Sequence, residues 1–154
     1  MSSTLASRPL FTIQMSLHPL HDLGATPHGH RRVIPVSGGV FEGDRLRGSV
    51  LPHAGSDWLI ERADGAFQQD ARLGLQTDDG AVISMTYRGI RHSAPEVAAR
   101  LARGEAVDHA EYYLRTAPFF ETGAPRYAWL NTILAIGVGR RIPAGVIYDV
   151  FEIL

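Results

Sequence analysis

Residues 67–89 read FQQDARLGLQTDDGAVISMTYRG, and this stretch decides the fold class. From Phe67 to Gln76, apolar or small side chains alternate with polar ones, which is the period of a half-buried strand. Asp79-Gly80 is the strongest hairpin signal in the chain, because glycine adopts the positive φ that a tight turn needs. Ala81 to Gly89 then returns as the partner strand. The sequence therefore predicts an antiparallel hairpin at the centre of the fold.

The same strand pattern recurs on both sides of this hairpin, with turn residues between. Further strands are expected at Pro9–Leu17, Arg31–Val40, Asp44–Val50, Asp57–Arg62, Asp108–Ala117, Tyr127–Val138 and Gly145–Ile153. His18–His30 is expected to be a loop rich in Pro, Gly and His. Ser93–Arg103 is the one predicted helix, with Ser93 as its cap and Gly104 as its end.

About eight or nine strands with one short α-helix predict a mainly-β fold, a single antiparallel β-barrel. Several strands are apolar on both faces, which favours a closed barrel whose outer surface is covered by the helix or by a second subunit. We expect one domain over residues 1–154, with a flexible N-terminal tail at 1–8.

Composition narrows the possible partners and location. The formal net charge of −1 gives no indication of a nucleic-acid or membrane-surface partner. No apolar run approaches the roughly 20 residues that a membrane span needs. The first residues, MSSTLASRPL, lack the basic start and apolar stretch of a signal peptide, so a cytoplasmic location is expected.

Two residue types are missing, and each absence excludes chemistry. The chain has no cysteine, which excludes a thiol nucleophile, disulfides and thiolate metal sites. It also has no lysine, since all 15 basic residues are arginine, which excludes a Schiff base and a P-loop lysine. Any anion site must therefore use arginine, whose planar fork suits carboxylates. We expect no cofactor.

Residues 111–131, EYYLRTAPFFETGAPRYAWLN, mix aromatic rings with charged groups, which is typical of a small-molecule pocket. Tyr113 and Arg115 share one strand face, and Trp129 and Asn131 are expected to share another. If both faces point into the barrel, these four side chains surround one cavity. Glu121 lies between them, and burial beside two phenylalanines would raise its carboxyl pKa and suit a general acid or base. Alternatively, Glu121 pairs with an arginine and only holds the loop.

Asp57 and Trp58 open a strand after a glycine-containing break. The carboxylate suits a catalytic base at the barrel mouth with the indole as a wall, although an aspartate that caps a turn beside a core tryptophan fits equally well. Arg72 lies on a polar strand face, which lines either solvent or a wet cavity.

Tyr87 and Arg91 flank a tight stretch just before the predicted helix. Arg91 suits the binding of a carboxylate or enolate oxygen, or else a surface ion pair with an acid such as Glu96, which would contribute little. The histidines His18, His21, His28 and His30 gather in one loop. They match no metal-binding motif, so no metal site is predicted.

Four ordered motifs together resemble a known family: VIPVSGGVFEGDRLRGSVLPHAGSDW (33–58), DARLGLQTDDGAVISMTYRGIRH (70–92), PEVAARLARGE (95–105) and EYYLRTAPFFETGAPRYAWLN (111–131). The chain is similar, over about residues 8–153, to the family catalogued as domain of unknown function 3237. The resemblance implies a compact β-barrel that self-associates, so a homo-oligomer is expected. It also favours a cavity role for Arg72.

Two functional hypotheses follow. The first is a cofactor-free enzyme that moves protons in a barrel cavity, by isomerisation, cyclisation or dehydration of a small oxygenated or carboxylate-bearing molecule. The second is a binding protein with the same arginine-lined cavity and no turnover; a purely structural oligomer comes third. The predicted catalytic residues are Glu121, Asp57 and Arg115. The predicted substrate-binding residues are Trp58, Arg72, Tyr87, Arg91, Tyr113, Trp129 and Asn131.

Overall fold

The computed structural model describes residues 3–154. Its strands are β1 (Ser7–Leu17), β2 (His21–Thr26), β3 (Gly29–Glu42), β4 (Arg47–Val50), β5 (Ser56–Glu61), β6 (Phe67–Thr77), β7 (Val82–Ser93), β8 (Tyr112–Glu121), β9 (Leu134–Ile142) and β10 (Gly145–Ile153). The helical elements are α1 (Pro95–Ala102) and two 3₁₀ helices, η1 (His109–Glu111) and η2 (Pro125–Thr132).

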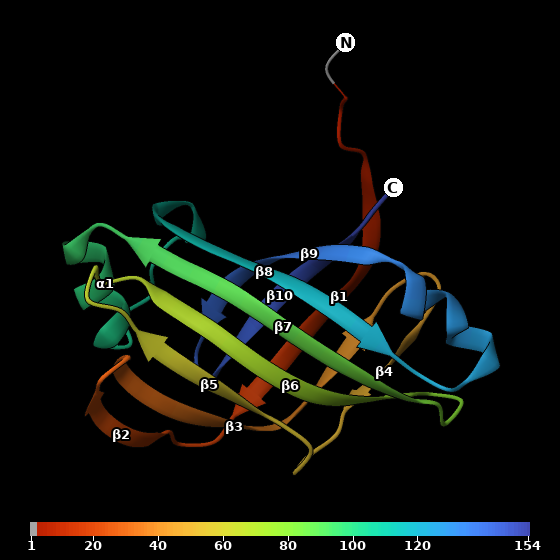
Figure 1. Ribbon diagram of the computed structural model, residues 1–154, viewed down its shortest axis with the longest axis horizontal. Helices are drawn as coiled ribbons and strands as arrows, with labels where there is room; N and C mark the ends of the chain where they lie inside the picture. The colour runs from red at the N-terminus through yellow and green to blue at the C-terminus, as the bar shows by residue number, and fades with distance from the viewer. Residues whose placement is uncertain (1–2) are drawn as a thin grey trace.

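The strands form a closed antiparallel barrel (Figure 1). The sheet order runs β1-β10-β9-β8-β7-β6-β4-β3, and β1 also pairs with β3, which closes the ring at eight strands. β4 and β5 both lie between β3 and β6: β4 pairs with the Gly39–Glu42 half of β3, and β5 with its His30–Pro35 half. The predicted antiparallel barrel is confirmed.

The predicted central hairpin is present. β6 and β7 pair from Phe67 opposite Arg91 to Gln76 opposite Val82, and Gly80 in the turn has a φ of 91°. Alternation directs one set of side chains into the barrel, where Ile83, Met85 and Tyr87 are buried. The hairpin therefore supplies two walls of the interior.

The barrel end that holds the β6–β7 turn is packed with apolar side chains. Phe11 lies 5.5 Å from Phe41 and 5.8 Å from Phe120, measured between ring centroids. η2 covers this end through the buried side chains of Tyr127 and Leu130. α1 lies at the opposite end (Figure 1). We call these the closed end and the open end.

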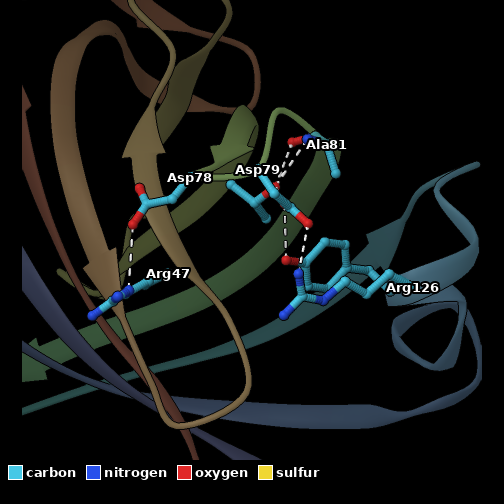
Figure 2. A network of polar contacts seen from close by, with 7 residues as sticks. Arg47, Asp78, Asp79, Ala81 and Arg126 are labelled. Atoms are coloured by element: carbon cyan, nitrogen blue, oxygen red, sulfur yellow. Dashed lines mark hydrogen bonds and ion pairs between the residues drawn. The ribbon is translucent and has the colours of Figure 1, made fainter.

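Asp79 ties the β6–β7 turn to η2 (Figure 2). Its carboxylate accepts hydrogen bonds from the Tyr127 hydroxyl at 3.0 Å, from Arg126 at 2.9 Å and from Thr77. The hydrogen bond from Thr77 is the largest cause of a lowered pKa of the Asp79 carboxyl. The hydrogen bond from Tyr127 and the charge of Arg126 lower this pKa further. The closed end is thus held by both apolar packing and a polar anchor.

Removing the Tyr127 hydroxyl should loosen this anchor. Tyr127→Phe is expected to lower the free energy of unfolding by about 1 kcal/mol, because a buried side chain loses its hydrogen bond. In a domain of this size the melting temperature should fall by about 2–4 °C in a thermal unfolding experiment. Arg126→Ala is the control: its exposed ion pair with Asp79 should contribute about 0–1 kcal/mol. Equal melting temperatures for Tyr127→Phe and the wild type would contradict the anchor.

Three sequence predictions about elements are wrong in part. Residues 18–30 contain β2, which pairs with β3, rather than a loop throughout. Residues 125–132 form η2 rather than the start of a strand, because Pro125 begins a helical turn and Asn131 bonds back to the Thr122 backbone. The strand expected from Asp108 begins at Tyr112, after η1.

The N-terminal and helical predictions also need adjustment. Of the expected tail at 1–8, residues 1–2 lie outside the described part, while β1 already begins at Ser7. The predicted helix is present as α1, but its N-cap is Ala94 and no side chain caps it. Within residues 3–154, no helix has the length and apolar character needed to cross a membrane.

Candidate functional site

A cleft of about 1110 Å³ lies at the open end of the barrel. Its walls come from the ends of β3, β5, β6, β7, β8 and β9 and from α1. The charged and aromatic side chains along it include Arg32, Glu61, Phe67, Arg91 and Arg141. This end therefore carries a cleft in which charged side chains stand among apolar ones.

Asp57 and Tyr87 face the interior in a single cross-strand row. Asp57 on β5 is opposite Ala71 on β6, and Ala71 is opposite Tyr87 on β7. Ala71 and Tyr87 are both buried, with 3% and 5% of their surfaces exposed. Because Ala71 has only a methyl side chain, nothing large separates the carboxyl group from the phenol on either side of it.

Burial raises the pKa of the Asp57 carboxyl from 3.8 to about 6. A hydrogen bond from the Asp70 backbone N–H to Asp57 Oδ1, 2.9 Å long, opposes this rise, and the charge of Asp70 adds to it. The carboxyl group therefore exchanges its proton close to neutral pH, as a general acid or base should. A carboxyl pKa raised by burial was predicted for Glu121, whereas the structure places such a group at Asp57.

Tyr148 on β10 joins this pair from across the barrel. Its ring centroid lies 5.6 Å from that of Tyr87, in an edge-on arrangement. Burial, followed by the charge on Asp57, raises the pKa of Tyr148, and burial likewise raises the pKa of Tyr87. Both phenols therefore keep their protons at neutral pH and can donate hydrogen bonds.

Gly139 on β9 makes the room for the Tyr148 ring. A methyl group in place of its hydrogen would lie 2.5 Å from Tyr148 Cε1 and 2.6 Å from a Leu114 methyl carbon. No side chain larger than hydrogen fits there without displacing one of them. The glycine is thus needed for the position of the phenol rather than for a backbone turn.

Arg91 and Arg141 connect the interior cluster to the cleft. Both line the cleft, and the positive charge of each acts to lower the pKa of Tyr148. Burial and then the charge of Arg141 lower the pKa of Arg91 to about 10. The guanidinium of Arg91 lies 4.3 Å from the Phe67 ring centroid. The Tyr112 hydroxyl accepts a hydrogen bond of 2.8 Å from the backbone N–H of Arg141.

Neither arginine forms an ion pair with a carboxylate among the described residues, although the charge of Glu61 in the same cleft acts on Arg91. Within residues 3–154, the ion pairs of the cleft include Arg32 with Glu61, at 3.1 Å, and none involves Arg91 or Arg141. The alternative considered for Arg91, an ion pair with a surface acid such as Glu96, is not found among the described residues. Two adjacent guanidinium groups without ion-pair partners attract an anionic ligand oxygen.

Gln69 is a further polar residue of the interior, on β6 between the rows of Asp57 and Arg91. Only 6% of its surface is exposed, and its Oε1 has no hydrogen-bond partner among the described residues. A buried acceptor without a donor is uncommon in folded proteins and calls for an explanation.

Three predicted site residues lie in the barrel interior or at its mouth: Asp57 and Tyr87 share an interior row, and Arg91 lines the cleft, which Tyr113 on β8 also lines. Two others, Trp58 and Arg72, lie on the outside of the barrel, in a groove of about 700 Å³ that Phe119 also lines. Half of the Trp58 surface is exposed. Alternation explains the split, because Asp57 faces inward and its neighbour Trp58 must face outward.

The predicted convergence of residues 111–131 inside the barrel does not occur. Tyr113 is 45% exposed and Arg115 stacks on its ring at 4.9 Å, both on the outer face of β8. Glu121, at the end of β8 by the closed end, is exposed.

Trp129 and Asn131 lie in η2 and have structural contacts there. Arg45 stacks on the Trp129 ring at 4.1 Å, and the Asn131 side chain bonds to both the N–H and the C=O of Thr122. Sequence reasoning missed Tyr148, Arg141 and Gln69. Gln69 and Tyr148 gave a signal, since each alternates with apolar residues on the inward face of its strand.

The histidine-rich segment forms part of the β2–β3 hairpin. His30 Nε2 lies 2.6 Å from Asp22 Oδ1, and the neighbouring Gly24 backbone also donates to Asp22. Within residues 3–154, no three His, Cys, Asp or Glu side chains gather as a metal site would need.

Fold and site together define a class: a small closed antiparallel barrel with a half-buried aspartate and two phenols in its interior and two arginines lining a cleft at its open end. The chain belongs to the family described as "Protein of unknown function (DUF3237)", which matches residues 5–153.

Similar proteins support this membership. The chain is 38% identical to a UPF0311 protein of Rhodopseudomonas palustris over 154 residues, all of both chains. A crystal structure of a conserved R. palustris protein of unknown function, also 38% identical, superimposes with a TM-score of 0.95 over 99% of this chain and 100% of that one. More distantly, the chain is 25% identical to a hydroalkoxylation enzyme of Penicillium herquei over 142 residues, covering 88% of this chain and 79% of the other.

Proposed function

We propose that the protein is an enzyme that transfers protons within a small oxygenated or carboxylate-bearing molecule bound inside the open end of the barrel. The observation that carries this proposal is Asp57, a half-buried carboxyl group with a pKa of about 6 in the same interior row as Tyr87. A carboxylate held partly out of water destabilises the folded protein. Such carboxylates are concentrated at active sites, where they act as acids or bases.

Each group of the cluster then has a role. Arg91 and Arg141 hold an anionic oxygen of the substrate at the cleft. Asp57, in its ionised form, removes a proton from an acidic O–H or C–H of the substrate. The negative charge that develops moves onto a substrate oxygen, where the hydroxyls of Tyr87 and Tyr148 donate hydrogen bonds to it. Asp57 then returns the proton at a second atom, which completes the transfer without net change in protons.

The Penicillium herquei relative supports this type of chemistry. Hydroalkoxylation adds an O–H group across a carbon–carbon double bond: the oxygen forms a bond to one carbon, and the proton ends on the other. Both the removal and the return of a proton are the steps assigned here to Asp57. We therefore favour ring-forming addition, or its reverse elimination, over simple isomerisation.

The test combines a binding screen with a proton-exchange assay. A thermal-shift screen against aromatic and enolisable carboxylates should find a class that stabilises the protein; a ligand at 100 times its dissociation constant adds about 2.7 kcal/mol. Each hit is then incubated with the protein in D₂O and followed by NMR. The wild type should place deuterium at carbon or convert the hit, and Asp57→Asn should do neither while still binding it.

Each other outcome has a definite meaning. Hits that bind and stay unchanged with the wild type would refute the enzyme and leave a binding protein, since the Arg91–Arg141 pair would suffice for that. Equal turnover by Asp57→Asn would remove Asp57 as the proton carrier. Glu121→Gln is the matched control, because Glu121 is an exposed carboxylate at the other end of the barrel and should leave turnover unchanged.

A further inference from the structure

The buried Gln69 side chain points to the class of substrate. Gln69 lies on the inward face of β6, opposite Gly89 on β7. A methyl group added to Gly89 would lie 2.8 Å from Gln69 Oε1, so the amide lies over the glycine inside the barrel. Any side chain at position 89 would occupy the space that the Gln69 carboxamide now fills.

The position of Gln69 relative to the other groups is set by strand register. Along β7, Tyr87, Gly89 and Arg91 are successive inward positions, so the Gln69–Gly89 row lies between the Asp57–Tyr87 row and the Phe67–Arg91 row. Successive inward rows are roughly 6–7 Å apart. Gln69 and Asp57 lie deeper than the residues that line the cleft, so a molecule that reaches from Arg91 to Asp57 extends inward from the cleft and passes Gln69.

We propose that Gln69 Oε1 accepts a hydrogen bond from a hydroxyl group of the substrate, so that the site selects anions that also carry a hydroxyl one row deeper than the anionic oxygen. This inference rests on the proposed function, because it takes the barrel interior as the substrate site. Two independent observations support it: an acceptor with 6% exposure that lacks a donor, and Arg91 one row away, which has no ion-pair partner and lines the cleft together with Arg141. Together they fit the two ends of a hydroxylated carboxylate, such as a phenolic acid.

Three probes test this selectivity by isothermal titration calorimetry: 4-hydroxybenzoate, benzoate and 4-methoxybenzoate. The wild type should bind 4-hydroxybenzoate about tenfold more tightly than benzoate, the effect of one hydrogen bond to a buried acceptor. 4-Methoxybenzoate has no hydrogen to donate and should gain nothing. In Gln69→Leu the preference should disappear while the affinity for benzoate is retained.

Stability provides a second readout. Because Oε1 has no partner to lose, Gln69→Leu should melt at the wild-type temperature or above it. A lower melting temperature would mean that Gln69 is structural and would overturn the inference. An equal preference for 4-hydroxybenzoate in the wild type and in Gln69→Leu would also overturn it. Equal binding of 4-hydroxybenzoate and 4-methoxybenzoate by the wild type would overturn it without any variant.

A companion variant separates this inference from the proposed function. Arg91→Gln should weaken binding of benzoate and 4-hydroxybenzoate by the same factor, leaving their ratio unchanged. If neither probe binds the wild type, the anion clamp and the Gln69 inference fall together. If both bind equally well, only the Gln69 inference falls, and the proton-transfer role of Asp57 is decided separately by deuterium incorporation.

Discussion

Asp57→Asn is expected to raise the free energy of unfolding by up to about 3 kcal/mol at pH 7, while it removes turnover. Burial raises the pKa of Asp57 from 3.8 to about 6, and each pKa unit corresponds to about 1.4 kcal/mol. At pH 7 the folded protein therefore holds a carboxylate that would be more stable in water. Asparagine is uncharged, has the same shape, and keeps an oxygen to accept the Asp70 N–H.

The sign of the pH dependence follows from proton uptake. Between pH 4 and pH 6 the folded protein keeps the Asp57 proton while the unfolded chain has released it, so stability falls as pH rises through this window. Below about pH 4 both states are protonated at Asp57, and the gain from Asp57→Asn should vanish. Urea unfolding at pH 4 and pH 7, for wild type and variant, measures the difference.

The control for this measurement is Glu121→Gln, which removes an exposed carboxylate and should change stability by no more than about 0.5 kcal/mol at either pH. If Asp57→Asn instead destabilises the protein at pH 7, the carboxylate is held by favourable partners and is not the strained group on which the proposed function rests. A gain in stability with loss of turnover would be the trade-off typical of active sites.

The fold was predictable because the determining signals are local. Alternation from Phe67 to Gln76 and the Asp79-Gly80 turn define the central hairpin, and both are properties of adjacent residues. η2 was not predictable in the same way. Pro125 is a local sign of a helical turn, but the aromatic residues Tyr127 and Trp129 that follow are also common in strands. The tertiary contact of Tyr127 with Asp79 holds the segment as a helical cover.

The site depended on information that alternation does not carry. On β8, both faces hold aromatic and polar side chains, so the pattern did not show that Leu114 and Phe120 face inward and Arg115 outward. Asp57 and Tyr87 are 30 positions apart in sequence and meet only through the register of β5, β6 and β7. Tyr148 comes from the last strand and joins them because the barrel is closed.

Gly139→Ala should damage the site and the fold together. The added methyl group would lie 2.5 Å from Tyr148 Cε1 and 2.6 Å from Leu114, and both side chains are buried, with 3% and 1% exposed. Overpacking of this kind costs about 1–3 kcal/mol. Because Tyr148 also packs against Tyr87, displacement of its ring should change the near-ultraviolet circular dichroism of the tyrosines and reduce turnover.

Gly123→Ala is the matched control for this substitution. A methyl group at Gly123 would meet no atom within 4 Å, so its stability should stay within about 0.5 kcal/mol of the wild type. A stable Gly139→Ala protein with unchanged dichroism would mean that β9 moves to accept the methyl group. In that case Tyr148 would not depend on Gly139 for its place. If stability falls and turnover falls further than the folded fraction does, then the ring position itself matters to the reaction, as expected of a phenol that donates to the developing charge.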